Sequence, residues 1–288
     1  MEVPTFSELG KNARDVFKTG YYYGKGIFKL NVKSKKTGIF EMSSDLTLNV
    51  DVMKLDGLLE TKYKTDDYGN FIQRWTTDGT ASIGCELSGK IIENISMLSE
   101  FFYNPQTTFK GMRLDTKYIN DRINGIVSLA NDNFDSNLNL YGAIVMKFKE
   151  MFLGYQCGYK TATKELTKND IGLAFSYQDT FFHLRCNSIP REFGCSILYK
   201  VNSDWDIAVN GISSSSGNWN EWMVGIAAKY AIDEESILRL KINSAMQLGT
   251  SLQQKLNENT MISLSFCFDC ININRGNHKV GLALDIEA

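Results

Sequence analysis

Apolar and polar residues alternate along most of this 288-residue chain. The run Phe28-Lys29-Leu30-Asn31-Val32-Lys33 is typical, with apolar residues at even positions and polar residues at odd ones. Because successive side chains of a β-strand point to opposite faces, each such run predicts a strand with one apolar and one polar face. Turn sequences such as Asp78-Gly79 and Asn202-Ser203-Asp204 separate the runs, which predicts a series of hairpins.

The number of predicted strands limits the fold. Roughly fifteen to twenty strands in one domain cannot form a flat open sheet, so the sheet must close or divide into two packed sheets. A soluble sandwich would bury the apolar parity, whereas a membrane barrel would turn it towards lipid and turn the polar parity towards a water-filled lumen. Periodicity alone leaves both open. The segment 91–102 has the weakest pattern and is predicted as a strand.

Aromatic residues favour the membrane barrel. Tyr and Trp are enriched where strands meet the membrane–water interface. In this chain they gather near the predicted strand ends, at Tyr63, Tyr68, Trp75, Tyr155, Tyr159, Tyr177, Trp205, Trp219, Trp222 and Tyr230. No run of 18 or more apolar residues occurs, so we expect any membrane crossing to be made by strands.

The stretch from Pro4 to Gly20 is the exception to the alternation, and it predicts one continuous amphipathic helix. Thr5 and Glu8 have capping-box spacing, and Gly20 can provide a left-handed stop. No apolar core of a signal peptide precedes it, so we expect the helix to remain and to rest on the β-structure. Its predicted apolar stripe consists of Phe6, Leu9, Gly10, Ala13, Val16 and Phe17.

Composition and motifs argue against several classes of function. A net charge of -2 provides no overall basic field for nucleic acid. The six cysteines are scattered, and the pair Cys267 and Cys270 has no second pair or nearby histidine to complete a zinc site. His183 and His278 have no evident nucleophile or acid partner. We therefore expect no metal, no cofactor and no enzymatic activity.

Several segments resemble the mitochondrial porin, or voltage-dependent anion channel, family of eukaryotic porins. The similarity extends over essentially the whole chain. It is carried by Leu9-Gly10-Lys11-Asn12-Ala13-Arg14-Asp15-Val16-Phe17, Gly57-Leu58-Leu59-Glu60-Thr61-Lys62-Tyr63, Arg74-Trp75-Thr76-Thr77-Asp78, Gly225-Ile226-Ala227-Ala228-Lys229-Tyr230-Ala231-Ile232-Asp233 and His278-Lys279-Val280-Gly281-Leu282-Ala283-Leu284.

The resemblance implies an all-β transmembrane barrel of about 19 strands in the mitochondrial outer membrane. The first and last strands would meet in parallel. Residues 1–24 would form the helix and its linker inside the lumen, and residues 25–288 the barrel. Such a protein is a voltage-gated diffusion pore for small ions and for metabolites such as ATP, ADP and NADH. It is embedded in the lipid bilayer and can form homo-oligomers.

The resemblance also implies functional positions. The pore-lining and gating residues would be Lys11, Arg14, Asp15, Lys18, Lys29 and Lys33. Nucleotides would contact Lys11, Lys18, Gln247, Leu248, Gly249 and the run from Ser265 to Asp269. Gln73 occupies a lipid-facing position at which many relatives carry an acidic residue. Ordinary lumen-lining residues that touch solute only in passing are an equally good interpretation of the nucleotide positions.

The chain departs from the family pattern near the helix. Relatives read Phe-Thr-Lys-Gly where this chain reads Phe17-Lys18-Thr19-Gly20, which turns the lysine by about 100° around a helix. They carry Gly-Tyr-Gly-Phe-Gly where this chain reads Gly20-Tyr21-Tyr22-Tyr23-Gly24, so we expect a stiffer hinge. Two alternatives stay open: a weakly conducting paralogue that acts as a docking platform, and a soluble β-barrel that binds an apolar ligand.

The charges on predicted inward parities nearly cancel, which predicts anion preference that is weak, absent or shifted towards cations. The helix adds three cations, Lys11, Arg14 and Lys18, against Glu8 and Asp15, and the first strand adds Lys29 and Lys33. The carboxylates are Glu41, Asp45, Asp56, Glu60, Glu86, Asp285 and Glu287, and the further cations are Lys54, Lys62, Arg74, Arg185, Arg239 and Lys241.

Overall fold

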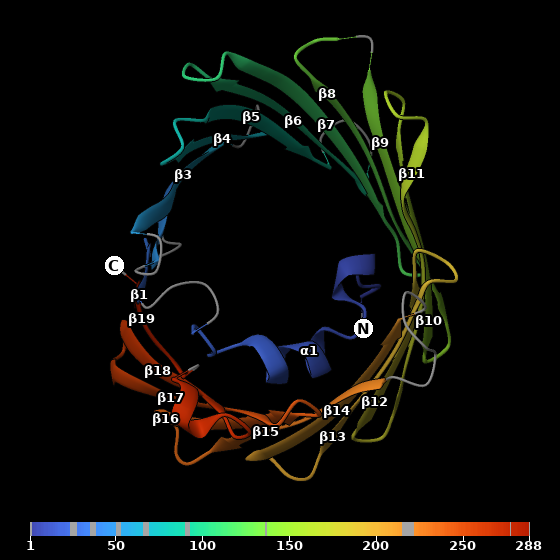
Figure 1. Ribbon diagram of the computed structural model, residues 1–288. Helices are drawn as coiled ribbons and strands as arrows, with labels where there is room; N and C mark the ends of the chain where they lie inside the picture. Colours follow the sequence, from blue (N-terminus) through green and yellow to red (C-terminus); the bar gives the residue numbers. More distant parts are fainter. Residues whose placement is uncertain are drawn as a thin grey trace.

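A computed structural model describes residues 2–23, 28–34, 39–49, 53–65, 69–89, 93–135, 137–214, 222–276 and 278–287. Within these residues, nineteen strands form one closed sheet that surrounds a lumen (Figure 1). The predicted all-β barrel is therefore confirmed. The predicted boundary between residues 24 and 25 lies outside the described residues, as do Tyr68 and Trp219.

The strands follow one another around the barrel in sequence order. Their bounds are β1 Phe28–Lys33, β2 Phe40–Asn49, β3 Lys54–Thr65, β4 Gly69–Thr76, β5 Ala81–Ser88, β6 Ile95–Asn104, β7 Phe109–Ile119, β8 Ile123–Asp132, β9 Leu138–Phe148, β10 Met151–Lys160, β11 Glu165–Tyr177, β12 Thr180–Asn187, β13 Glu192–Lys200, β14 Trp205–Ser214, β15 Trp222–Ala231, β16 Ser236–Asn243, β17 Gln247–Asn257, β18 Thr260–Asp269 and β19 Lys279–Glu287.

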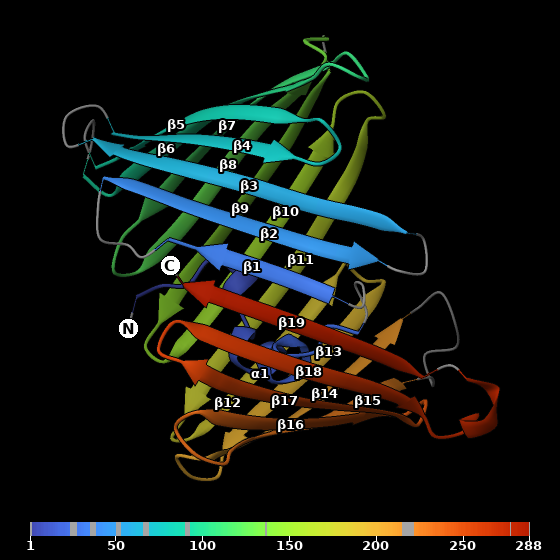
Figure 2. The same ribbon diagram turned by 90° about the vertical axis from the view of Figure 1, so that its left-hand side faces the viewer.

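Neighbouring strands are antiparallel except at the seam between β1 and β19, which run in the same direction (Figure 2). The seam aligns Phe28 with Leu282 and Lys33 with Glu287. A side-chain hydrogen bond crosses it, in which Asn31 Nδ2 donates to Asp285 Oδ1 at 3.1 Å. The parallel closure implied by the family resemblance is confirmed.

The two parities of the strands face opposite sides of the wall. Ser265 of β18 contacts the N-terminal segment inside the lumen, which fixes the inward parity there, and the strand register carries that assignment around the ring. The other parity carries large apolar side chains such as Trp75 and Ile83, which are 52% and 63% exposed. A soluble sandwich would bury these residues, so that alternative is wrong.

The N-terminal segment contains two short helices instead of the single helix predicted. A 3-10 helix spans Phe6–Glu8, and α1 spans Lys11–Lys18. Gly10 between them has a left-handed backbone with φ of 67°, and it lies so close to the His183 ring that no side chain would fit there. The left-handed residue turns the chain and ends the first helix.

The local signals at the two ends of this segment are confirmed. Thr5 and Glu8 form a capping box, with the Thr5 backbone N–H donating to Glu8 Oε2 at 2.9 Å. This hydrogen bond holds the pKa of Glu8 below its usual range. At the other end α1 stops at Lys18, and Gly20 takes the left-handed conformation with φ of 84°.

The apolar stripe of the segment rests on the inner wall, as predicted. Ala13 and Val16 pack against Leu198, Ala208 and Ala227 of β13, β14 and β15. Further towards the N-terminus, Val3 and Leu9 pack against Val145 and Phe152 of β9 and β10. Figure 1 shows α1 beside β13–β15 and far from β3–β8. The helix therefore lines one side of the lumen.

Two further findings concern the predicted elements. The ambiguous segment 91–102 is a strand as predicted, but β6 begins at Ile95, after Asn94 with φ of 68°. Residues 90–92 lie outside the described part. In the described chain, no helix combines the length and apolar character needed to cross a membrane.

Candidate functional site

The chain that follows α1, here called the linker (Thr19–Tyr23), is fixed to the inner wall of β16–β19. Four wall side chains hold backbone groups of the linker or of the helix end. Lys241 Nζ donates to Phe17 O at 2.7 Å, Arg239 Nη1 to Thr19 O at 3.4 Å and Ser251 Oγ to Gly20 O at 2.6 Å, and Ser265 Oγ accepts from Tyr22 N at 3.1 Å. The Lys241 ammonium lies at the C-terminal end of α1, where a cation is stabilising.

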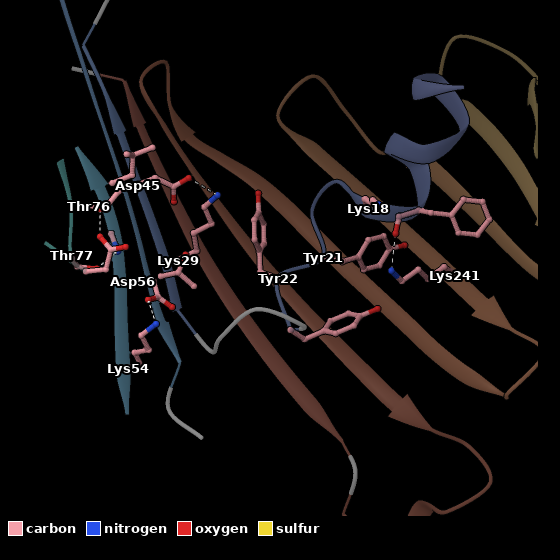
Figure 3. Close-up of a pocket in the computed structure, with 16 residues that line it drawn as sticks. Lys18, Tyr21, Tyr22, Lys29, Asp45, Lys54, Asp56, Thr76, Thr77 and Lys241 are labelled. Carbon is pink, nitrogen blue, oxygen red and sulfur yellow. Dashed lines mark hydrogen bonds and ion pairs between the residues drawn. The ribbon is translucent and has the colours of Figure 1, made fainter. Parts of the chain in front are cut away.

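The Lys241 ammonium also lies against two aromatic rings of the linker. Its Nζ is 3.9 Å from the centre of the Tyr21 ring and 5.4 Å from that of Tyr23 (Figure 3). The two rings meet edge to face with centres 5.9 Å apart. Burial raises the pKa of the Tyr21 and Tyr23 hydroxyls. These contacts clamp the linker to β16.

Glycines mark the path of the linker on the wall. A Cβ added at Gly281 would lie 2.5 Å from Tyr23 N and 2.6 Å from Tyr22 C. One added at Gly249 would collide with the Tyr23 hydroxyl. Since real Cβ atoms do not approach so closely, a side chain at Gly281 requires the linker backbone to move, and one at Gly249 requires the Tyr23 side chain to move.

A cavity of about 830 Å³ lies between the linker and β1–β4 (Figure 3). Lys18 and Tyr22 line one side of it. On the other side, its cations are matched by carboxylates: Lys29 is 3.0 Å from Asp45, and Lys54 is 2.8 Å from Asp56. The lumen is therefore open next to the helix, and its far side carries balanced charge.

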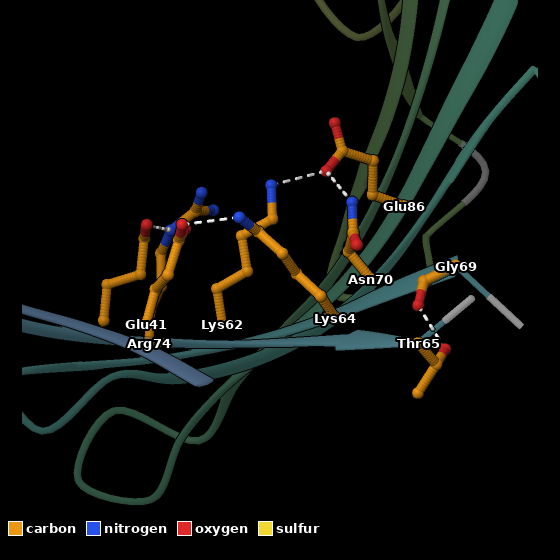
Figure 4. Close-up of polar contacts among 9 residues, drawn as sticks. Glu41, Lys62, Lys64, Thr65, Gly69, Asn70, Arg74 and Glu86 are labelled. Atoms are coloured by element: carbon orange, nitrogen blue, oxygen red, sulfur yellow. Dashed lines mark hydrogen bonds and ion pairs between the residues drawn. The ribbon is translucent and has the colours of Figure 1, made fainter. Parts of the chain in front are cut away.

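The balanced charge extends along β2–β6, and Figure 4 shows Glu41, Lys62, Lys64, Arg74 and Glu86 of this region. In Figure 1, β3–β6 lie across the lumen from α1. The ion pairs are Lys64–Glu41 at 2.5 Å, Lys62–Glu86 at 2.9 Å, Arg74–Glu60 at 2.6 Å and Arg74–Glu100. Arg113 of β7 adds a pair with Asp115 at 2.9 Å. We call the inner face of β1–β7 the ion-paired wall.

The predicted pore-lining residues lie in different surroundings. Lys11 is exposed beside a cavity of about 300 Å³ next to β11 and β12. Asp15 faces a separate cavity that Arg239 also lines, whereas Arg14 and Lys18 face a third cavity. The remaining two belong to β1, where Lys29 is paired with Asp45 and Lys33 is exposed.

The predicted nucleotide positions on β17 and β18 do not form one open site. Gln247 is exposed and bonds with Asn243 at the hairpin. Leu248 has the outward parity, so its side chain cannot meet a solute in the lumen. The other three are Gly249 under the Tyr23 hydroxyl, Ser265 buried under Tyr22, and Asp269, which accepts from the backbone N–H groups of Ile271 and Asn272.

The sequence analysis did not predict some of the residues that line the lumen. Lys64, Glu100 and Ser251 were not predicted, although each has the inward parity and a defined partner. Glu100 belongs to the segment 91–102, whose alternation is weak, so the sequence did not indicate which face of the strand its side chain occupies. Lys64 and Ser251 could have been found by extending the alternation of their strands.

The described residues contain no group of His, Cys, Asp and Glu suited to a metal ion. The six cysteines are all free thiols. The arrangement allows solutes to bind to, and to pass along, a wall of fixed charges and hydrogen-bonding groups.

Gln73 lies on the outer face of β4 and is exposed there, as the resemblance predicts for its position. Carbodiimides react with carboxyl groups, and they label one best in an apolar surrounding where it stays protonated. We expect dicyclohexylcarbodiimide to leave position 73 unlabelled in the wild type and to label it in Gln73→Glu, as read by peptide mass spectrometry. Equal labelling of the two proteins at this strand would show that another carboxylate takes that role.

The chain matches known proteins over nearly its full length. The family model of eukaryotic porins matches residues 2–281. Among curated proteins, the non-selective voltage-gated ion channel VDAC1 of Homo sapiens is 33% identical over 287 residues, which is 99% of each chain. The VDAC2 channel of Xenopus laevis is 34% identical over 288 residues, again 99% of each.

A closed barrel with an apolar outer face and a charged lumen defines a membrane β-barrel. The comparisons show that this membrane β-barrel is a channel and not an enzyme. The chain belongs to the eukaryotic porin family.

Proposed function

We propose that the protein is a voltage-gated diffusion pore of the mitochondrial outer membrane that passes small ions and metabolites, including ATP, ADP and NADH. The observation that carries the proposal is the position of the N-terminal segment. It lies along β9–β19 and leaves the cavity of about 830 Å³ beside it open. The membership of the eukaryotic porin family supports the membrane and the voltage dependence. Homo-oligomer formation stays a prediction.

Reconstitution in a planar bilayer tests the pore. We expect stepwise conductance that falls when the voltage is raised in either direction. Folded protein that inserts into the bilayer without conducting would favour the docking-platform alternative.

The ion-paired wall supports weak selectivity for small ions. Six of its lumenal cations lie within 4.0 Å of a carboxylate: Lys29, Lys54, Lys62, Lys64, Arg74 and Arg113. Lys33 and Lys117 share the inward parity but form none of the ion pairs of the described residues. Paired charges produce little net field beyond the Debye length of about 8 Å at physiological salt, which is short compared with a wide pore.

The corresponding prediction is measured as the reversal potential in a KCl gradient. We expect a value close to zero, because the paired charges concentrate neither K⁺ nor Cl⁻ strongly. A value near the chloride equilibrium potential would contradict this expectation. A more basic relative measured in the same gradient is the control.

Nucleotide contact is proposed for Lys11 and Lys18, which are both exposed on α1. Contact at Gly249 and Ser265 would require the linker to leave the wall, because Tyr22 and Tyr23 cover them. We therefore propose that passing nucleotides meet the helix first.

A further inference from the structure

The two mouths of the barrel carry different charge. Because neighbouring strands alternate in direction, the turns after odd-numbered strands lie at one mouth and those after even-numbered strands lie at the other. In Figure 2, β1, β3 and β19 point towards the first of these mouths, at the left. We call it the acidic mouth, because the described part of every turn after β5, β7, β9, β11, β13, β15 and β17 contains a carboxylate.

Carboxylates outnumber cations in the turns of the acidic mouth. Within the described residues, these turns contain two exposed cations, Arg122 and Lys149. Six turns contribute one exposed carboxylate each: Glu93, Asp121, Glu150, Asp179, Asp204 and Glu258. The turn after β15 contributes three more, Asp233, Glu234 and Glu235. None of these nine carboxylates belongs to an ion pair of the described residues.

The turn after β15 keeps its charge because of its backbone geometry. The Glu235 backbone N–H donates to Asp233 Oδ1 at 2.8 Å, and this hydrogen bond holds the pKa of Asp233 below its usual range. The carboxylates of the acidic mouth lie in separate turns around the ring. They therefore produce a diffuse negative field and do not form a binding site for one ion.

Charges at the strand ends offset this excess only slightly. We count the two residues of each strand that lie nearest the acidic mouth. Among those described, the cations are Lys33, Lys64, Lys147 and Lys200, and the carboxylates are Glu41, Asp206 and Glu287. The cations are more numerous by one, so the turns still determine the sign of the charge at this mouth.

The opposite mouth is balanced. Among its turn residues whose side chains the structure describes, Asp78 and Asp135 are matched by Lys164 and Arg191. The two strand residues nearest this mouth include Lys29, Lys54, Lys110, Lys160 and Lys279 against Asp132, Glu165, Glu192 and Asp269. The ion-paired wall between the mouths is also matched. The negative charge of the described turns is therefore concentrated at one end of the pore.

The field of a charged mouth depends on the salt that bathes it. The Debye length is about 10 Å at 0.1 M salt and about 3 Å at 1 M. In dilute solution the fields of neighbouring turns overlap, and they raise the local concentration of cations at the entrance. In concentrated solution the field of each carboxylate is screened close to its own turn.

We propose that the acidic mouth makes the selectivity of the pore directional. Cations are preferred when the dilute solution bathes this mouth, and the preference fades when the concentrated solution does. The solutes favoured most are multivalent cations such as organic polyamines, because the energy of an ion in a given potential grows with its charge. The proposal rests on the pore function. The near-zero reversal potential expected from the ion-paired wall then belongs to the direction in which the acidic mouth is screened.

The test records the reversal potential of single channels in bilayers of neutral lipid, with about 1 M KCl on one side and about 0.1 M on the other. The two solutions are then exchanged. Each channel is thus measured in both directions of the gradient, so the comparison does not depend on its orientation in the bilayer. Charge in the middle of the lumen contributes to both measurements, and the difference between them reports the mouths.

Two triple variants assign the difference to one mouth. Glu234→Lys/Glu235→Lys/Glu258→Lys leaves six carboxylates against five cations in the described turns of the acidic mouth. The matched control Asp132→Lys/Asp135→Lys/Glu165→Lys makes the same change of charge at the opposite mouth. All six replaced side chains are exposed, and circular dichroism checks that both variants keep the barrel.

For the wild type, we expect the K⁺-to-Cl⁻ permeability ratio to be about twofold higher in one direction of the gradient than in the other. The acidic-mouth variant should lose most of this difference. The control should keep or enlarge it, because the added lysines make the opposite mouth basic and the two mouths more unlike.

Three results would overturn the proposal. The first is an equal permeability ratio in both directions for a conducting wild type, in which case the pore function stands and only the directional selectivity fails. The second is a difference that survives unchanged in the acidic-mouth variant, and the third is a difference that the control also loses. A protein that inserts without conducting would contradict the pore function and the directional selectivity together.

Discussion

Gly281→Val is expected to lift the linker off the barrel wall. The valine side chain would occupy the space of Tyr22 and Tyr23, so the hydrogen bond from Tyr22 N to Ser265 and neighbouring contacts would break. Losing roughly 1–2 kcal/mol of docking raises the population of the released linker about 5- to 30-fold. Trypsin cleavage after Lys18 in reconstituted protein should accelerate by a similar factor, and the steepness of voltage closure should change.

The control for Gly281→Val is Gly125→Val on β8. Gly125 has the outward parity, and a Cβ added there would have nothing within 4 Å. Both variants should keep the circular dichroism of the barrel. If the two are cleaved at the same rate, the linker is not held by the wall in the way described.

Arg74→Gln is expected to destabilise the barrel strongly. Arg74 bridges Glu60 and Glu100, and the Glu100 side chain is only 4% exposed, with Ser82 as its other hydrogen-bond donor. Removing the cation leaves a buried carboxylate without a counter-charge, which costs on the order of 3–5 kcal/mol. The free energy of unfolding in urea with lipid vesicles measures this loss. The reversal potential should move towards cation preference, because the wall gains net negative charge.

Two further variants serve as controls for Arg74→Gln. Lys54→Gln removes a cation from a pair whose side chains are 65% and 59% exposed, so no measurable loss of stability is expected. The double variant Arg74→Gln/Glu100→Gln removes both the cation and the buried carboxylate, and it should recover most of the lost stability. A double variant as unstable as Arg74→Gln would assign the effect to packing.

The wall was predictable from sequence because strand geometry is strictly periodic. Because Phe28, Leu30 and Val32 face the lipid, the alternation of side chains along a strand places Lys29 in the lumen. The same alternation along the next strand places its partner Asp45 in the lumen. Ion pairs between residues on strands that are not direct neighbours were not predictable. Lys62 meets Glu86 across the intervening strand β4, which depends on the register of two successive hairpins.

For the N-terminal segment, the amphipathic character was predictable from the sequence, but the course of the chain along the wall was not. Its apolar stripe and capping box are local properties of the sequence. The break at Gly10 depends on the distant His183, and the docking of Tyr22 depends on Ser265. Such contacts join residues far apart in sequence, so no local pattern records them.

The parallel seam has a consequence for the order of assembly. Asn31 and Asp285 are separated by 254 positions in the chain, so the first strand must wait for the last before the ring can close. Until then β1 and the newest strand both present unpaired backbone edges, which readily join foreign strands. Biogenesis must therefore shelter two edges at once, and a chain truncated before β19 would keep both of them open permanently.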